Sequence, residues 1–435
     1  MPQDLIQLDA RKLPTRIVLI LFLVLATAWS YYAFRWYLGN TLAEYFNTDE
    51  NNMDLARVAG TMAPNDPLTH WRLAQVSTKT LPLDQSAVAL FEYEKAVSLS
   101  PSDYRFWMAL GTAREHAGEI EKAEAALRKA TSLAPSYAYP HWYLGNLLLR
   151  SGRYDEAFHE LRIASEGDPA VLRPQMFNMI WAVYGDDLES LPAVIGPSAE
   201  ARSSFALYLL NQQKVDEAVR IWNTIGPDEK KTRKAEGDSI VNTLIILRRF
   251  QDALSVWNDL APTPASRAQL GRITDGSFEE AISYGPDTVF GWQVKTPPQT
   301  QIGIDPNTSH GGGRSLRMVF QVRTKLEAML AFQLVPVVPD SSYDFECFLK
   351  TAKFQSGGGP LTIQILDANQ GTSLATSESA PNGDNDWTRV ALPFKTAAKT
   401  EAVTVIIVRG GCGDATVCPI FGNVWYDDFS INRRN

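Results

Sequence analysis

The chain has 435 residues, of which 45% are hydrophobic and 21% are charged, and its formal net charge at pH 7 is −8. A chain of this length and composition can bury the cores of two or three domains. The negative charge argues against a nucleic-acid partner, because the phosphates of a nucleic acid need a basic surface.

Near the N-terminus, residues 17–34 form an 18-residue stretch without a charged side chain, which reaches the threshold for a membrane-spanning helix. Its far end is crowded with aromatic residues, as is typical of a membrane–water interface: Trp29, Tyr31, Tyr32, Phe34, Trp36 and Tyr37. We therefore expect a transmembrane signal-anchor helix over residues 17–37, after a cytoplasmic tail formed by residues 1–16.

The charges around this segment predict its orientation. Basic residues lie before it: Arg11, Lys12 and Arg16. After Arg35 the charges are acidic: Glu44, Asp49 and Glu50. This bias predicts a single-pass membrane protein with a cytoplasmic N-terminus and with the bulk of the chain in the periplasm or outside the cell. A signal peptide cleaved after Ala28 is the alternative, because Ala26-Thr27-Ala28 has the small-x-small form of a cleavage site. Both interpretations predict export.

After the N-terminal apolar segment, residue types recur with a period of 34 residues. Pro101, Pro135 and Pro169 are each 34 residues apart, and Leu-Gly pairs recur at Leu110-Gly111 and Leu144-Gly145. Small and large residues of the second half of the unit also recur: Ala123, Leu127 and Ala130, then Ala157, Leu161 and Ala164. An earlier unit contains Trp71, Ala74 and Ala96, with about three extra residues near 81–84. Such a period is typical of stacked helix-turn-helix repeats.

This pattern resembles the tetratricopeptide repeat family. The resemblance is strong over residues 64–169 and weakens afterwards, where second-helix patterns reappear at 215–222 and 250–257. Residues 175–184 and 188–195 could supply a further helix pair, although Pro192 interrupts the second of these helices. We expect an α-helical solenoid over residues 50–262 with five or six helix pairs. The resemblance implies that an unknown protein partner binds in the solenoid groove.

Near residue 262 the helical pattern gives way to short alternating runs separated by glycine, proline and asparagine. Strands are predicted at 315–322, 328–335, 343–350, 361–366, 388–394, 402–409 and 424–431. Strands without intervening helices predict an antiparallel β-sandwich of the jelly-roll type over residues 268–433.

The cysteines all lie in this region. Cys347 falls within an alternating strand pattern, so we expect it on the buried face. Cys412 and Cys418 bracket a short loop, and in an exported protein a disulfide between them is the natural expectation. Two free thiols are the alternative.

Short motifs at the two ends of the predicted sandwich resemble a carbohydrate-binding module of the jelly-roll type. The opening motifs are Gly276-Ser277-Phe278-Glu279 and Gly291-Trp292, and the closing motif is Asp427-Asp428-Phe429-Ser430-Ile431. The resemblance implies a structural calcium ion held by Glu279 and by Asp427 or Asp428, with backbone oxygens of the 310–313 loop. Solvation of a sheet edge by these carboxylates is the alternative.

Glycan binding by such a module needs exposed aromatic rings. The candidates for stacking on a sugar are Trp387, Trp425, Tyr343 and Phe354. For each of them, as for Trp292, a structural role is the alternative.

We find no sequence motif for catalysis. The histidines are scattered, with no metal-binding His-Glu-x-x-His pattern and no phosphate-binding glycine loop. We therefore expect no enzyme and no cofactor besides the calcium ion. The combination of anchor, solenoid and sandwich predicts a scaffold of the bacterial cell envelope that serves the assembly or export of a surface polysaccharide. A pure protein-assembly factor whose jelly roll binds no sugar is the alternative.

Overall fold

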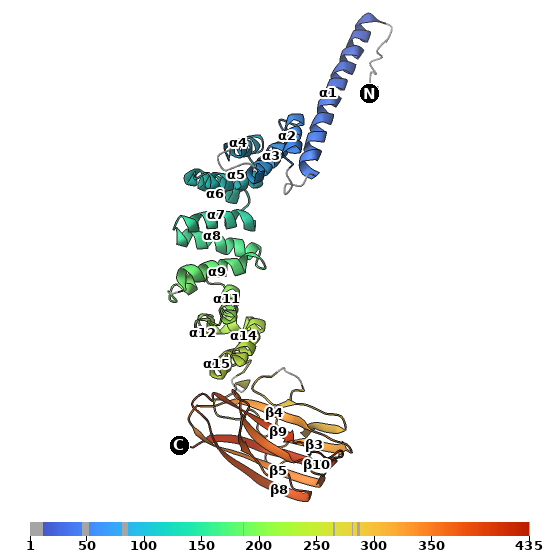
Figure 1. The fold of residues 1–435 in the computed structure, drawn as a ribbon, viewed down its shortest axis with the longest axis vertical. Coiled ribbons are helices and arrows are strands. Elements are labelled where there is room, and N and C mark those ends of the chain that lie inside the picture. The colour runs from blue at the N-terminus through green and yellow to red at the C-terminus, as the bar shows by residue number, and fades with distance from the viewer. Residues whose placement is uncertain are drawn as a thin grey trace, which may run out of the picture. The chain divides into compact units, whose positions relative to one another are not determined.

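The computed structural model describes residues 12–45, 52–80, 86–185, 187–263, 266–280, 282–284 and 288–434. Within these ranges the chain forms helices up to residue 260 and strands from residue 293 onward (Figure 1). The chain divides into two compact units, Met1–Gly196 and Pro197–Asn435. The expected turn at residues 81–84 lies outside the described residues, as do Arg11, Asp49 and Glu50.

The first unit is helical. In the part that the structure describes, one long helix, α1, is followed by nine shorter ones. Their bounds are α1 (Leu13–Tyr45), α2 (Met53–Met62), α3 (Pro67–Thr80), α4 (Ser86–Leu99), α5 (Tyr104–His116), α6 (Ile120–Leu133), α7 (Ala138–Arg150), α8 (Tyr154–Gly167), α9 (Leu172–Tyr184) and α10 (Leu191–Ile195). Helices α3 and α4, α5 and α6, and α7 and α8 pack as helix-turn-helix pairs. Helix α10 has only five residues, and Pro192 lies in its first turn.

A glycine allows the two helices of each 34-residue unit to approach closely. A Cβ atom at Gly111 of α5 would lie only 2.6 Å from Leu127 Cγ of α6. At Gly145 of α7, it would lie 2.7 Å from Leu161 Cγ of α8. The Leu-Gly pairs and the leucines that recur in the sequence therefore contact each other at the crossing of the two helices.

The turn within each pair also repeats. Gly118 and Gly152 lie two residues before the second helix of their pairs, with φ values of 79° and 76°. After Gly152, the amide of Arg153 donates to the carbonyl of Leu148 at 3.0 Å. A left-handed residue followed by a hydrogen bond that reaches back five residues is the Schellman ending of a helix.

The second unit begins with five helices within its described residues. They are α11 (Ala199–Asn211), α12 (Val215–Asn223), α13 (Pro227–Thr232), α14 (Lys234–Ile246) and α15 (Phe250–Leu260). Helices α12 and α15 begin where the weaker second-helix patterns begin in the sequence. Gln213 and Arg248 precede them by two residues, with φ values of 60° and 62°. The left-handed turn before the second helix is therefore kept at Gln213 and Arg248, although neither residue is a glycine.

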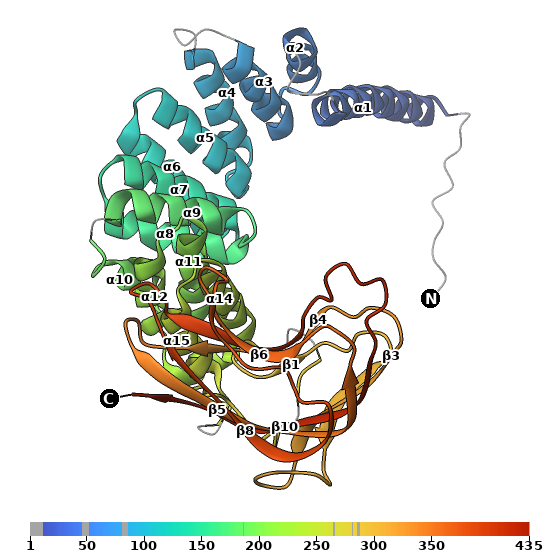
Figure 2. The ribbon, with the colours of Figure 1, turned by 60° about the horizontal axis from the view of Figure 1, so that its bottom comes forward.

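The described strands of the second unit form two antiparallel sheets. Their orders are β1-β4-β9-β6-β7 and β2-β3-β10-β5-β8. Figure 2 shows the sheets as two layers, with β4 and β6 in one and β5, β8 and β10 in the other. The bounds are β1 (Gln293–Val294), β2 (Thr300–Asp305), β3 (Ser315–Val322), β4 (Ala328–Pro336), β5 (Ser342–Ser356), β6 (Leu361–Asp367), β7 (Ser373–Thr376), β8 (Gly383–Lys395), β9 (Ala402–Arg409) and β10 (Ile420–Arg433). The fold is the predicted β-sandwich.

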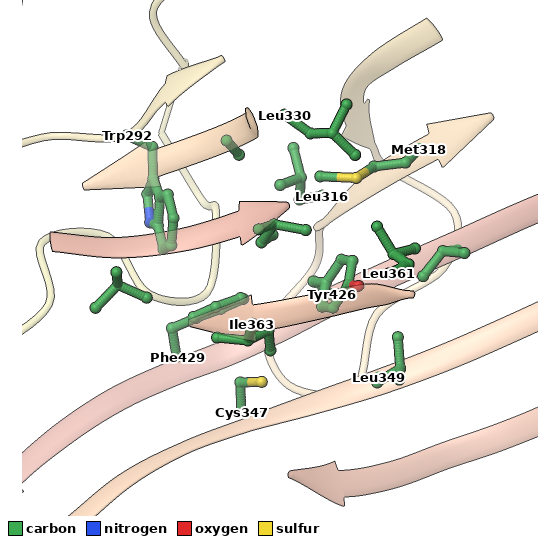
Figure 3. Close-up of a cluster of buried hydrophobic side chains, with 14 of the residues drawn as sticks. Trp292, Leu316, Met318, Leu330, Cys347, Leu349, Leu361, Ile363, Tyr426 and Phe429 are labelled. Atoms are coloured by element: carbon green, nitrogen blue, oxygen red, sulfur yellow. The ribbon is translucent and has the colours of Figure 1, made fainter. Parts of the chain in front are cut away.

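Apolar side chains from both sheets fill the space between them (Figure 3). Trp292 is 3% exposed. The centroid of its ring system lies 5.2 Å from that of Phe278 and 4.8 Å from that of Phe429. These three residues belong to the opening and closing motifs of the sandwich. The motifs therefore meet in the hydrophobic core, where aromatic packing joins the two ends of the domain.

Candidate binding surfaces

Helices α5 and α7 border a hollow of about 870 Å³ in the first unit. Its lining residues are Thr112, Glu115, His116, Ile120, Trp142, Tyr143, Asn146, Leu147, Arg150 and Ser151. Tyr143, Asn146 and Arg150 are three and four residues apart, so one face of α7 lines the hollow. Tyr139 and Tyr143 expose 48% and 36% of their surface. Exposed aromatic rings beside an arginine are typical of protein interfaces.

The second helices present a different surface. Arg128 of α6 donates to Glu124 at 2.8 Å and to Glu156 of α8 at 3.0 Å. Arg153 donates to the same two carboxylates, at 2.7 Å to Glu124 and at 2.6 Å to Glu156. These four side chains therefore connect neighbouring repeats to each other. Exposed tyrosines lie on both helices of the α7–α8 repeat, Tyr139 and Tyr143 on α7 and Tyr154 on α8. Of these three, Tyr143 lines the hollow.

Ring nitrogens join each clear repeat to the proline that precedes it. Trp107 Nε1 donates to the Pro101 carbonyl at 2.9 Å. The two other repeats carry histidine at this place: His70 Nε2 lies 2.9 Å from the Pro64 carbonyl, and His141 Nε2 lies 3.1 Å from the Pro135 carbonyl. This contact was not predicted from the sequence. The signal was a ring residue six positions after Pro64, Pro101 and Pro135.

Both histidines contact a carboxylate through their other ring nitrogen. His70 Nδ1 lies 2.6 Å from Glu92 Oε2. His141 Nδ1 lies 2.6 Å from Glu160 Oε2. The hydrogen bond to Glu92 raises the pKa of His70 above its ordinary value of 6.5, against the opposing effect of burial.

The long helix α1 has two parts. Its apolar part is long enough to cross a membrane and is not buried by the rest of the structure. The polar contacts begin at its end: Arg35 Nη2 donates to the Thr61 carbonyl at 2.8 Å, and Asn40 Nδ2 donates to Asp66 Oδ2 at 2.8 Å. Gly39 and Ala43 are buried in the same region. The helix therefore continues from its exposed apolar segment into packed contact with the helices that follow.

Two of the four predicted sugar-stacking residues cannot contact a ligand in this structure. Tyr343 is 1% exposed and Phe354 is fully buried. Along β5 as far as Thr351, the residues that share the parity of Cys347 point into the core, and Tyr343 is one of them. The register of β5 against β8 shifts between Thr351 and Phe354, which turns Phe354 inward as well.

Trp425 is also occupied by contacts within the protein. It is 8% exposed, and its Nε1 donates to Asp305 Oδ2 at 2.7 Å. The guanidinium of Arg317 lies 5.4 Å from the centroid of the Trp425 ring. A cation over the ring face occupies the surface that a sugar ring would need.

Trp387 is the predicted stacking residue with the most accessible surroundings. It is half-buried on β8. His310 lies edge-on to it, with ring centroids 5.7 Å apart, and stacks on Phe348 at 3.6 Å. Next to Trp387 in the chain, Asp386 accepts a hydrogen bond from Lys350 Nζ at 2.6 Å. Aromatic rings beside polar groups are the chemistry that a glycan site requires. His310 and Phe348 were not predicted from the sequence as residues of this site.

The predicted calcium residues lie beside the 310–314 loop. Glu279 Oε1 accepts the amide of Gly313 at 2.7 Å, and Asp427 Oδ2 accepts the amide of His310 at 2.6 Å. Asp428 Oδ2 lies 2.7 Å from His310 Nδ1. Burial raises the pKa of Asp427, against the effect of the amides that it accepts.

This arrangement does not fit a calcium shell. The loop presents N–H donors to the carboxylates, whereas calcium needs oxygen ligands that converge on one point. Among the described residues, no group of three or more His, Cys, Asp or Glu side chains is placed to hold a metal ion. The carboxylates hold the loop through hydrogen bonds. Calcium binding by Glu279, Asp427 and Asp428 stays a prediction of the resemblance.

The cysteines lie at one end and in the core of the sandwich. Cys412 and Cys418 form a disulfide, with their Cα atoms 6.2 Å apart. Cys347 is free and buried. Burial raises the pKa of the Cys347 thiol far above its ordinary value, so this thiol stays protonated at neutral pH.

Comparison with known proteins identifies part of the helical repeats. The sequence model of the tetratricopeptide repeat family matches residues 83–138. None of the curated proteins compared with the chain matches it.

Solved structures are similar to parts of the chain at low sequence identity. A crystal structure of MamA is 19% identical, with 39% of this chain and 82% of MamA covered and a TM-score of 0.26. The CBM22-1 xylan-binding domain of Paenibacillus barcinonensis Xyn10C is 14% identical, with coverages of 38% and 97% and a TM-score of 0.24. The CBM22-1-GH10 modules of Clostridium thermocellum xylanase 10B, complexed with xylohexaose, are 16% identical, with coverages of 38% and 29% and a TM-score of 0.25. By its fold and its repeat match, the chain is a multidomain protein with a tetratricopeptide-type solenoid followed by an antiparallel β-sandwich.

Proposed function

We propose that this protein is a non-enzymatic scaffold of the bacterial cell envelope, which α1 anchors in the membrane. Its helical repeats bind a protein partner, and its sandwich binds a glycan during the assembly or export of a surface polysaccharide. The observation that carries the proposal is the hollow that α7 lines with Tyr143. Tyr139 of the same helix is also exposed, whereas the arginines and glutamates of α6 and α8 pair with each other.

The protein partner is tested by co-purification of the full chain from envelope membranes. A Tyr139→Ala/Tyr143→Ala variant removes two exposed rings of α7 and leaves the core untouched. We expect it to lose the partner that the unaltered chain retains. The matched control is Lys129→Ala on the exposed side of α6, which should retain the same partner. Equal recovery with both variants would place the binding surface elsewhere.

The packing of α1 supports an uncleaved anchor. The apolar part of α1 is exposed, and the same helix continues through Gly39 and Ala43 into contact with α2. We propose a cytoplasmic N-terminus with the repeats outside the cytoplasm. The intact mass of the membrane-extracted protein tests the anchor, because cleavage after Ala28 would remove the first 28 residues. Protease digestion of intact cells and of inverted vesicles tests the orientation.

The glycan site of the proposal is centred on Trp387, with His310 and Phe348 beside it. A glycan array probed with the detergent-solubilised full chain, with and without calcium, tests the sugar and also the calcium ion that the resemblance implies. Binding that disappears on chelation would support the ion as well.

A pure protein-assembly factor is the second candidate. The burial of Tyr343 and Phe354 and the arginine over Trp425 favour it, because three of the four predicted stacking rings are occupied by the protein itself. An array without any bound glycan would support this candidate, and the co-purification experiment would still test the protein partner.

A further inference from the structure

An arginine without an ionic partner is buried beside the disulfide. Arg409 is the last residue of β9 and is fully buried. Its Nη1 donates to Ser356 Oγ at 2.8 Å, and its Nε has no hydrogen-bond partner. Among the described residues, no aspartate or glutamate forms an ion pair with Arg409. An arginine side chain is always charged in proteins, so its burial without a counter-charge is unfavourable.

The remaining nitrogen of this arginine points at a disulfide sulfur. Arg409 Nη2 lies 3.2 Å from Cys418 Sγ. The amide of Gly359 donates to the same sulfur at 3.3 Å. A disulfide sulfur is a weak acceptor, whereas a thiolate is a full negative charge that two N–H donors stabilise. The surroundings of Cys418 therefore match the thiolate better than the disulfide.

The two sulfurs of this disulfide have different access to solvent. Cys418 is fully buried, and its amide donates to the Thr324 carbonyl at 2.8 Å. Cys412 is half-buried and begins a loop whose residues 413–417 are all exposed. A small thiol from solution can approach Cys412, whereas the protein covers Cys418.

We propose that this disulfide is a thiol-exchange site at which Cys412 accepts an incoming thiol and Cys418 leaves as a thiolate stabilised by Arg409. The thiolate of a small-molecule thiol attacks Cys412 Sγ and forms a new S–S bond there. The bond between Cys412 and Cys418 breaks, and its electron pair stays on Cys418 Sγ as the thiolate. The mixed disulfide on Cys412 reverts when Cys418 attacks it and releases the small thiol.

Trapping the mixed disulfide tests the direction of attack. The full chain in detergent micelles is incubated with reduced glutathione, quenched with N-ethylmaleimide in denaturant so that the buried Cys418 is accessible, and digested without reductant. We expect glutathione on Cys412 and maleimide on Cys418, with at least a tenfold excess over the opposite arrangement. Glutathione on Cys418, equal labelling of the two cysteines, or the absence of any adduct would each overturn the proposal.

The role of Arg409 is tested on the thiol that it contacts. In a Cys412→Ser variant, absorbance at 240 nm reports the ionisation of Cys418 as the pH is raised, because Cys347 stays protonated. The expected midpoint lies below the ordinary cysteine value of about 8.5. A midpoint at or above that value would overturn the proposal.

A pair of substitutions separates charge from packing. Adding Arg409→Met to the Cys412→Ser variant should move the Cys418 midpoint upward, whereas adding Ser356→Ala, which leaves the arginine in place, should not. If Arg409→Met prevents folding, Arg409→Lys provides the second comparison, because it keeps the charge but loses the fixed fork of donors. With Arg409→Lys, the Cys418 midpoint should lie above the midpoint of the Cys412→Ser variant that keeps Arg409. An unchanged midpoint in the folded arginine variants would contradict the role of Arg409.

Discussion

His141 of α7 and Glu160 of α8 join the two helices of one repeat through a 2.6 Å contact between Nδ1 and Oε2. The other ring nitrogen of His141 faces the Pro135 carbonyl at 3.1 Å. Both atoms that face the ring are oxygens, so the two ring nitrogens of His141 connect α8 to the Pro135 carbonyl. His70 repeats this arrangement with Glu92 and Pro64. The solenoid thus contains two histidine–glutamate contacts of the same geometry, and at His70 the contact raises the pKa of the ring.

The stability of the helical repeats should therefore depend on pH. The folded state raises the pKa of His70, so this residue contributes stability that is fully present below the ordinary value of about 6.5. The contribution is lost as the pH rises through the folded-state pKa. Urea unfolding of the unaltered chain and of His70→Gln, followed by circular dichroism from pH 5.5 to 8.5, measures it. The difference between the two should shrink as the pH rises.

The control for this experiment is His116→Gln, because His116 is exposed at the end of α5. Its effect on the free energy of unfolding should be small at every pH. If His70→Gln changes the free energy of unfolding by the same amount from pH 5.5 to 8.5, the raised pKa of His70 is contradicted.

The close crossing of α7 and α8 predicts a destabilising alanine. Gly145→Ala places a Cβ 2.7 Å from Leu161 Cγ, and such overpacking should lower the free energy of unfolding by about 1–2 kcal/mol. In Gly60→Ala of α2, the nearest atom to the new Cβ is 4.0 Å away, so the better helix propensity should raise stability by up to about 1 kcal/mol. Denaturant titration measures both. Equal effects of the two substitutions would rule out the close crossing.

The left-handed turn before α12 predicts that a glycine substitution at Gln213 stabilises the fold. Gln213 has a φ of 60°, which costs a residue with a side chain about 1–2 kcal/mol. Gln213→Gly should recover about 1 kcal/mol of stability, because glycine adopts this conformation freely. The reverse change at the equivalent place, Gly152→Gln, should destabilise by a similar amount. Loss of stability in Gln213→Gly, measured by thermal unfolding, would show that the turn is not left-handed.

Much of this fold could be predicted from the sequence because its packing repeats. Leu127 and Leu161 recur at the spacing that brings them against Gly111 and Gly145, so the repeat period reports the helix crossing directly. The later helix pairs were visible only through their second helices, because Gln213 and Arg248 replace the turn glycines. The predicted strand bounds are correct for β3 and β9, which are buried within the sheets.

The elements that the sequence did not predict lie at the sheet edges. Strand β1 has two residues, β2 contains Gly303, and β7 has no fully buried residue. Edge strands are paired on one side, so a periodic apolar pattern is weak or absent in them.

The candidate sites were less predictable than the fold, because they depend on contacts between distant residues. The alternation that placed Cys347 inside also places Tyr343 inside, and this consequence was available from the sequence. The inward turn of Phe354 was not, because it follows from a register shift between β5 and β8. The cation over Trp425 comes from Arg317, on the neighbouring strand β3.

The sandwich site predicts that two tryptophans respond differently to substitution. Trp387→Ala should lower the affinity for a bound glycan at least tenfold, which corresponds to about 1.4 kcal/mol. It should leave the unfolding temperature nearly unchanged, because Trp387 is only half-buried. Trp425→Ala should lower the unfolding temperature, since it removes a buried ring and leaves Asp305 without its 2.7 Å donor. Glycan binding by Trp387→Ala that equals that of the unaltered chain would remove the proposed site.

Photo-crosslinking at Tyr143 is the most direct test of the proposal that the helical repeats bind a protein partner. A photoreactive phenylalanine replaces Tyr143 in the hollow beside α7 and, in a second variant, Lys129 on α6, and both are irradiated in intact cells. Mass spectrometry then identifies the attached peptides. We predict one protein crosslinked through Tyr143 and absent from the Lys129 variant. No adduct at Tyr143, or the same adducts at both positions, would contradict the proposal.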